Sequence, residues 1–109
     1  MDKDIGYLQL ILEKAKEAQE FVSGYTKEKF LEDNKTQSAV IMKLAVNGEI
    51  SKKISPETKS RIDLPWKEIS GFGNMAIHDY MQLSLKIIWT TIHKSLNDLV
   101  SKINFSLKN

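Results

Sequence analysis

The chain has 109 residues, of which 41% are hydrophobic and 28% are charged, and its formal net charge is +2. This length predicts a single domain over residues 1–109, because a second hydrophobic core would not fit. The absence of cysteine excludes disulfides, thiolate catalysis and cysteine-based zinc sites. The 15 lysines are spread along the chain, which indicates a solvated surface, and Arg61 is the single arginine.

The start of the chain is acidic and polar, without the apolar stretch of a secretory signal. No segment approaches the run of about 18 apolar residues that a membrane-spanning helix needs. We therefore expect a cytoplasmic protein without a membrane partner.

The first half of the chain predicts two long helices and a short one. Apolar residues at steps of three and four over 5–22 predict an amphipathic helix, and Gly24 is a plausible stop. Thr26 is expected to cap a short helix with Phe30 among its inward contacts. A long helix follows, capped by Asp33 or Asn34, and its central Gly48 indicates the close passage of another backbone.

In the second half of the chain a new helix is predicted at each of two prolines, and the last segment has the strongest apolar periodicity. Residues 55–57 (Ser-Pro-Glu) and 64–66 (Leu-Pro-Trp) each predict a helix start. Gly71 and Gly73 predict a bend or a close helix approach. From Ser84 onward a seven-residue rhythm predicts a last helix that frays beyond residue 103. No segment alternates like a strand, so the expected fold is an all-α, antiparallel bundle of four to five helices.

Acid–base catalysis near neutral pH would most readily use one of the two histidines, which are 15 residues apart. His93 is interpreted as a surface or boundary residue of the last helix. His78 follows Asn74 by four residues, and the stripe Lys67, Gly71, Asn74, His78 would line one helix face as a polar groove. Periodicity alone leaves open a purely structural histidine within the bundle. The chain contains no phosphate-binding glycine loop and no metal-ligand motif, so neither a metal nor a cofactor is predicted.

Residues 66–80 (WKEISGFGNMAIHDY) resemble the hallmark stretch of HepT-like proteins, a branch of the HEPN superfamily. Residues 30–40, 47–49 and 85–92 resemble the same family in the same order, so the resemblance covers nearly the whole chain. It implies a helical bundle that forms homodimers. It also implies a metal-independent ribonuclease that serves as the toxin of a type VII toxin–antitoxin pair. The implied partner is MntA, a minimal nucleotidyltransferase that silences the toxin by transferring AMP to the motif tyrosine.

The resemblance assigns roles to individual residues of this stretch. His78 takes the place of the motif histidine, Tyr80 that of the tyrosine that receives AMP, and Asn74 that of the polar residue after the motif arginine. The arginine position itself holds Gly73. A guanidinium grips phosphate with two parallel donors, and the loss of such a charge commonly costs a factor of about 100 to 1000 in rate. Lys67 is a possible substitute contact to phosphate, although it lacks the fork geometry.

Three interpretations follow from the glycine at position 73. The first is a ribonuclease that cleaves RNA at a His78-centred cleft across the dimer. The second is a catalytically degenerate binding module that keeps the dimer fold and the nucleotidyltransferase partner. The third is that Gly73 is a substitution, engineered or selected, that makes a toxic protein tolerable to its host.

Overall fold

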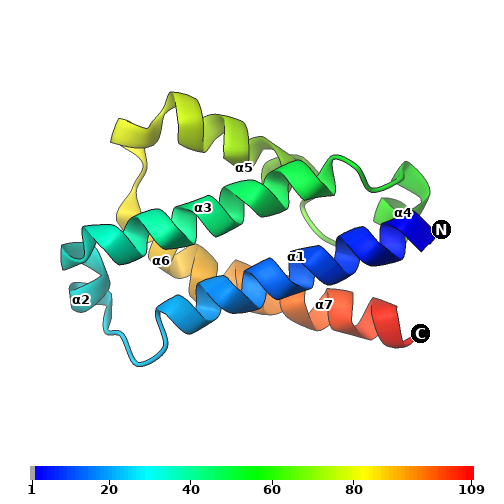
Figure 1. Ribbon diagram of the computed structural model, residues 1–109, viewed down its shortest axis with the longest axis horizontal. Helices are drawn as coiled ribbons and strands as arrows, with labels where there is room; N and C mark the ends of the chain where they lie inside the picture. The colour runs from blue at the N-terminus through cyan, green and yellow to red at the C-terminus, as the bar shows by residue number, and fades with distance from the viewer. Residues whose placement is uncertain (1) are drawn as a thin grey trace.

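The computed structural model describes residues 2–109, and these residues form helices and connecting turns without a strand. Four long helices run antiparallel in turn, and both ends of the chain lie at the same end of the bundle (Figure 1). The long helices are α1 (Asp2–Phe21), α3 (Asn34–Ser51), α5 (Trp66–His78) and a final one composed of α6 (Leu85–Thr90), the π-helical turn η2 (Thr91–Ser95) and α7 (Leu96–Lys108). The short α2 (Lys27–Glu32), α4 (Pro56–Arg61) and the 3₁₀ turn η1 (Tyr80–Gln82) connect them. The predicted all-α bundle is confirmed.

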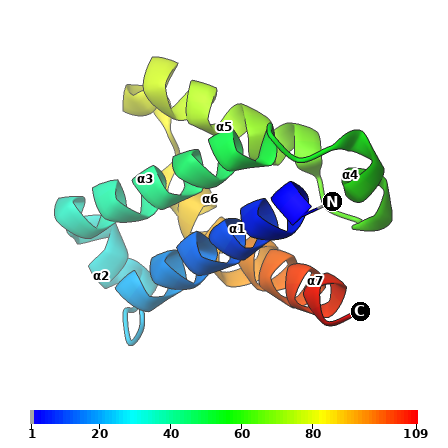
Figure 2. The same ribbon diagram turned by 45° about the vertical axis from the view of Figure 1, so that its right-hand side comes forward.

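The long helices pack in the order α5, α3, α1, α7, so α5 lies at the edge and packs mainly against α3 (Figure 2). The molecule measures 42 × 30 × 18 Å, and its short dimension is less than two helix diameters. Within the described part of the chain, no helix is both long enough and apolar enough to cross a membrane. A bundle this thin leaves one helix with a large part of its surface uncovered.

The predicted apolar stripes form the core. The fully buried side chains include Phe30 of α2, Ile11 of α1 and Ile103 of α7. Gly24 has a φ of +80° and ends the connection after α1, as its position predicted. The predicted fraying beyond residue 103 is wrong, because α7 continues to Lys108 while Leu107 packs against the core. The π-helical turn was not predicted, since no proline or glycine interrupts residues 85–108.

Side-chain caps begin the helices where the sequence placed them. The caps are Thr26 for α2, Asp33 for α3, Ser55 for α4 and Ser84 for α6. Asp33 also accepts hydrogen bonds from the hydroxyls of Tyr25 and Thr36, each at 2.7 Å, and these two bonds lower the pKa of its carboxyl to about 2. The buried Asp4 is held in the same way by Ser55 and Thr58, whose hydroxyls each donate at 2.6 Å, and this ties α1 to α4.

Glycine permits a very close crossing of α3 and α5. A Cβ atom at Gly48 would lie 2.6 Å from the carbonyl oxygen of Ile69, and one at Gly73 would lie 3.2 Å from the carbonyl oxygen of Ala45. The hydroxyls of Ser51 and Ser70 are hydrogen-bonded across the same crossing at 2.9 Å. The close approach predicted at Gly48 is therefore confirmed. Of the two alternatives predicted for Gly71 and Gly73, a bend or a close helix approach, the close approach is found at Gly73, and the helix continues through both glycines.

We expect Gly48→Ala to destabilise the protein by about 1–3 kcal/mol, the usual cost of overpacking, because the new methyl group would meet a backbone oxygen that cannot rotate away. Gly71→Ala on α5 is the matched control, since a Cβ there meets nothing within 4 Å and alanine favours the helix by up to about 1 kcal/mol. Urea unfolding of both variants measures the difference. Equal stabilities for the two variants would contradict the close crossing.

Candidate functional site

The predicted polar stripe lies on one exposed face of α5. Lys67, Gly71, Asn74 and His78 are all exposed, as steps of four, three and four on a helix require. A Cβ at Gly71 would have no neighbour within 4 Å, so the stripe is an exposed surface at this residue. Gly71 is also among the residues that line a cleft on this side of α5, whereas Asn74 and His78 are not.

His78 is the last residue of α5. The helix is closed there by Asp79, whose backbone N–H donates to the carbonyl oxygen of Met75 at 2.8 Å. Within residues 2–109 the His78 ring takes part in no hydrogen bond, so both ring nitrogens are available to a substrate. A free, exposed imidazole one helical turn from an amide is a suitable arrangement for proton transfer beside a bound phosphate or ribose.

Tyr80 turns back toward α3. Its hydroxyl lies 3.3 Å from that of Ser38, and 43% of the residue is exposed. Ser38 was not singled out from the sequence, because a contact across 42 residues leaves no local pattern. The phenol thus contacts α3 while the residue remains exposed.

Gly73 faces the opposite way from the polar stripe. It is buried against α3, where a Cβ would lie 3.2 Å from both the carbonyl oxygen of Ala45 and a carboxylate oxygen of Glu49. That carboxylate pairs with the ammonium of Lys52 at 2.8 Å. Position 73 is therefore a contact point between helices, with Glu49 of α3 and Lys52, the residue that follows α3, next to it.

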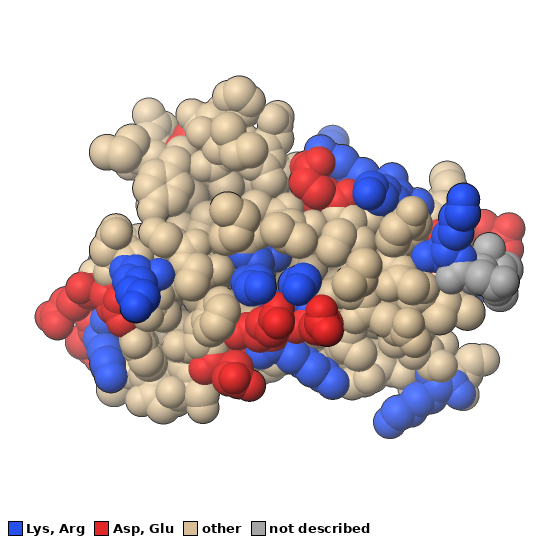
Figure 3. Space-filling view, in the orientation of Figure 1, with Lys and Arg blue, Asp and Glu red and all other residues tan. Residues whose placement is uncertain are grey.

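The end of α5 is almost free of charge. From residue 69 to residue 85 the single formal charge is that of Asp79. In the space-filling view the projecting part that carries this segment shows no lysine or arginine, whereas mixed charges gather over the far end of α3 (Figure 3). Lys67 begins the same helix, but 11 residues separate it from His78, roughly 16 Å along the axis. The two residues therefore lie about three helical turns apart on the same stripe.

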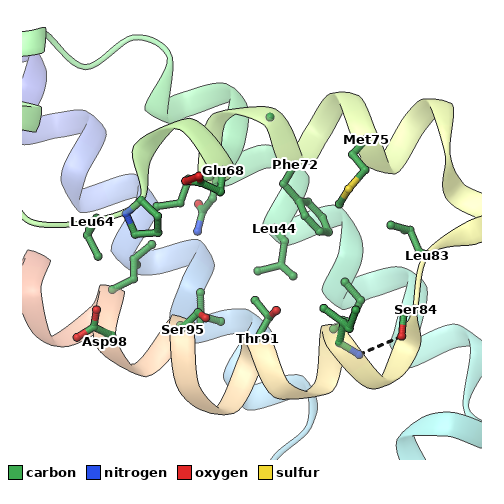
Figure 4. A pocket seen from close by; sticks show the side chains of 18 of the residues that line it. Leu44, Leu64, Glu68, Phe72, Met75, Leu83, Ser84, Thr91, Ser95 and Asp98 are labelled. Carbon is green, nitrogen blue, oxygen red and sulfur yellow. Dashed lines mark hydrogen bonds between the residues drawn. The ribbon is translucent and has the colours of Figure 1, made fainter.

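An apolar cleft of about 820 Å³ opens beside the polar stripe, between α5 and the last helix. Phe72 and Met75 of α5 point into it, Leu44 of α3 forms its floor, and Leu83 and Thr91 close the other side (Figure 4). Asp79, next to His78, lies at its rim. Within residues 2–109 no three histidine, aspartate or glutamate side chains gather as metal ligands.

Large apolar side chains around the cleft and the end of α5 are exposed. Met81 is 92% exposed, Ile77 76% and Ile87 66%, and Met75 and Tyr80 are more than two-fifths exposed. Of these residues Met75 and Ile87 line the cleft, whereas Ile77, Tyr80 and Met81 lie outside its lining. Single exposed apolar residues are ordinary, while a contiguous group of them is typical of a surface that binds another molecule.

A family model described as ribonuclease HepT-like matches residues 11–105 of the chain. The chain belongs to the HepT-like family. Similar proteins include a "Probable ribonuclease HepT" of Thermococcus cleftensis, which is 34% identical over 88% of both chains. A candidate RNase of Methanocaldococcus jannaschii is 36% identical, over 89% of this chain and 83% of its own. A candidate RNase of Caldanaerobacter subterraneus subsp. tengcongensis is 33% identical, over 89% and 88%. No solved structure matches the chain at a significant level.

Family membership confirms the resemblance carried by residues 66–80. In the structure this stretch ends at the exposed end of α5, with Asn74 and His78 on one face and Tyr80 directed to α3. Sequence reasoning missed the two charged residues beside Gly73. Their signal was a stripe along α3 at steps of seven, four and three, from Ser38 through Ala45 and Glu49 to Lys52 just past its end, which gives the face but not its neighbour.

Proposed function

We propose that this HepT-like protein is a metal-independent endoribonuclease with His78 as its acid–base group. The supporting observation is the exposed imidazole at the end of α5, one turn from the Asn74 amide, in a chain of a ribonuclease family. In the proposed reaction His78 takes the proton of a ribose 2′-hydroxyl. The 2′-oxygen then bonds to the adjacent phosphorus, and the bond to the 5′-oxygen breaks as that oxygen gains a proton. Asn74 would orient the phosphate by hydrogen bonding.

We further propose that the protein is the toxin of a toxin–antitoxin pair acting on cytoplasmic RNA, and that modification of Tyr80 silences it. A minimal nucleotidyltransferase of the MntA type would be the antitoxin. In the transfer the phenol oxygen bonds to the α-phosphorus of ATP, pyrophosphate leaves, and the phenol proton passes to solvent. Tyr80 is exposed, and its hydroxyl makes one hydrogen bond, to Ser38, which supports its role as acceptor. Tyr80 also lies two residues from His78. An adenylate there would block access to the imidazole.

A homodimer would complete the site. The accessible surface is 6907 Å², whereas a monomer of 12.5 kDa typically exposes roughly 6,200 Å². The excess is close to the ~800 Å² that each partner buries in a standard interface. The exposed apolar group that includes Ile77, Met81 and Ile87 provides the surface to cover, and no lysine or arginine interrupts residues 69–85. A second copy placed on this face would bring two His78 side chains toward one cleft.

Gly73 supports a second candidate function, a binding module that keeps the dimer and the nucleotidyltransferase partner without cutting RNA. At this position the packing against α3 favours a residue without a side chain. The missing guanidinium would then reflect a lost activity, and Tyr80 would still accept AMP.

We expect the purified protein to cleave single-stranded RNA in the presence of EDTA, and His78→Ala to slow cleavage by a factor of about 100 or more, as is usual for a lost general base. Gly73→Arg should raise the rate by up to about 100-fold, because it restores a charge that stabilises the transition state. Gly73→Ala is the matched control, since it adds the same Cβ without a cation. A gel assay with labelled RNA gives the rates. Equal inertness of the native chain and His78→Ala would leave the binding module as the function.

Incubation with an MntA-type nucleotidyltransferase, ATP and magnesium should add one AMP to the chain, at Tyr80. Tyr80→Phe should abolish the adduct, while Tyr7→Phe, at a phenol of α1 outside the site, should not. Intact mass spectrometry followed by peptide mapping measures both. If neither an adduct nor a stable complex forms, the nucleotidyltransferase is not a partner of this protein, and that part of both candidate functions is wrong.

Ile87→Glu, on the exposed rim of the cleft, should convert the proposed dimer to a monomer, because the charge would be buried without a partner. Phe105→Glu, at an equally exposed apolar residue of α7, is the control and should leave the assembly unchanged. Light scattering coupled to size-exclusion chromatography gives the molar mass. A monomeric native chain would disprove the homodimer.

A further inference from the structure

The apolar cleft between α5 and the last helix carries charge of one sign. The described residues that line it include Glu68, Asp79 and Asp98, but no lysine, arginine or histidine. Asp98 pairs with Lys102 at 3.1 Å, whereas neither Glu68 nor Asp79 belongs to an ion pair among residues 2–109. Two exposed acids at the rim of the cleft are therefore left without a compensating cation.

We propose that this cleft is the docking groove for a helix of the nucleotidyltransferase that modifies Tyr80, and that this helix has an apolar stripe flanked by lysine or arginine. The inference rests on the proposed modification of Tyr80. Amphipathic helices bind to apolar grooves through side chains on successive turns, and complementary charges fix their register. The groove would hold the modifying enzyme, while Tyr80 is the residue that reacts.

The cleft has the elongated form that a helix requires. Its two walls run antiparallel, and Met75 of α5 points into the space between them (Figure 4). The lining spans 11 residues of α5 and its cap from Glu68 to Asp79, and 15 residues of the other wall from Ser84 to Leu99. At 1.5 Å per residue these lengths are roughly 16 and 22 Å, which is room for about three to four turns of a partner helix. Basic residues at both ends of that helix would meet Glu68 and Asp79.

The groove ends at the turn that carries Tyr80. Asp79, Gln82 and Leu83 belong to its lining, whereas Tyr80 does not. The phenol hydroxyl lies instead 3.3 Å from the hydroxyl of Ser38 on α3. An enzyme held in the groove would therefore lie next to the acceptor without covering it, and its active site would have a high effective concentration at the phenol.

RNA and a second copy fit this cleft less well. The carboxylates of Glu68 and Asp79 would repel phosphates, because affinity for nucleic acid comes mainly from cations. Two copies with cleft facing cleft about a two-fold axis would place the same acids together, and residues 69–85 hold no lysine or arginine to offset them. The proposed homodimer would instead use apolar side chains outside the lining, including Ile77 and Met81.

The first test measures AMP transfer to the full chain by an MntA-type nucleotidyltransferase. Met75→Gln removes an apolar contact of the groove, and Glu68→Lys reverses a charge at the end remote from Tyr80. Each should raise KM for the chain about tenfold and leave kcat within about twofold, because only docking is weakened. Leu10→Gln is the control for exposure, since Leu10 on α1 is 43% exposed and Met75 42%. Glu20→Lys on α1 is the control for charge. Neither control should change KM.

The outcomes of this test are distinct. The substituted side chains are exposed or nearly half exposed, so urea unfolding of the variants should match that of the native chain. A native KM for both Met75→Gln and Glu68→Lys would overturn the docking groove and leave the modification of Tyr80 standing. A native chain that receives no AMP would instead defeat the proposed modification.

Binding without chemistry tests which molecule occupies the groove. In the Tyr80→Phe chain, which cannot accept AMP, adding Met75→Gln should weaken the Kd for the nucleotidyltransferase about tenfold by calorimetry. The molar mass of the Met75→Gln chain by light scattering, and its affinity for labelled single-stranded RNA, should stay native. A loss of molar mass would assign the groove to a second copy, and weaker RNA binding would assign it to RNA. Either result would overturn the proposal.

A photoreactive benzoylphenylalanine in place of Met75 tests the chemistry of the docked segment. After irradiation of the complex, mass spectrometry should place the cross-link in a helical segment of the nucleotidyltransferase, with lysine or arginine on both sides of its apolar residues. A cross-link to an acidic segment would contradict the charge complementarity. A complex that forms without any cross-link at this position would show that the groove is not part of the contact.

Discussion

The crossing of α3 and α5 at Gly48 and Gly73 determines most of what this molecule presents to solvent. Backbone meets backbone there, with 2.6 Å between a Cβ placed at Gly48 and the carbonyl oxygen of Ile69. The contact sets the axial position of one helix on the other, and the hydrogen bonds of Ser51 with Ser70 and of Ser38 with Tyr80 lie along the same line. Because α5 packs mainly against α3, this line of contact also orients the polar face that carries His78.

The same crossing gives a physical account of the glycine at the position where HepT-like proteins are expected to have an arginine. A side chain at Gly73 would begin 3.2 Å from a backbone oxygen, a separation that requires α3 to yield by a few tenths of an ångström. At this residue α5 can therefore either pack closely against α3, which requires glycine, or carry a cationic side chain, which requires the two helices to move apart. Glu49, which lies beside this position, pairs with Lys52, the residue that follows α3.

Two kinds of surface meet at the end of α5. One is the polar stripe that ends at His78, and the other is the apolar cleft with its exposed rim, which includes Met75 and Ile87. A segment with one acidic residue and neither lysine nor arginine attracts RNA poorly on its own, because affinity for nucleic acid comes mainly from cations at phosphates. It is better suited to contact with protein. Nuclease chemistry and protein recognition would thus share one end of one helix, and Tyr80 lies between them.

The amino-acid sequence by itself determined the helices, their caps and the common face of Asn74 and His78. These features depend on neighbours three or four residues away, so periodicity and capping residues reveal them. It also predicted a close approach at Gly48, because a glycine in the middle of a helix is destabilising unless another backbone packs against it. Only the tertiary structure decided which helix approaches, that Gly73 points into that contact, and that Lys52 lies beside it. It also decided that the polar stripe is an open surface next to an apolar cleft. Pairs such as Ser38 with Tyr80 are far apart in the chain, and what brings them together is the packing of whole helix faces, which no local pattern encodes.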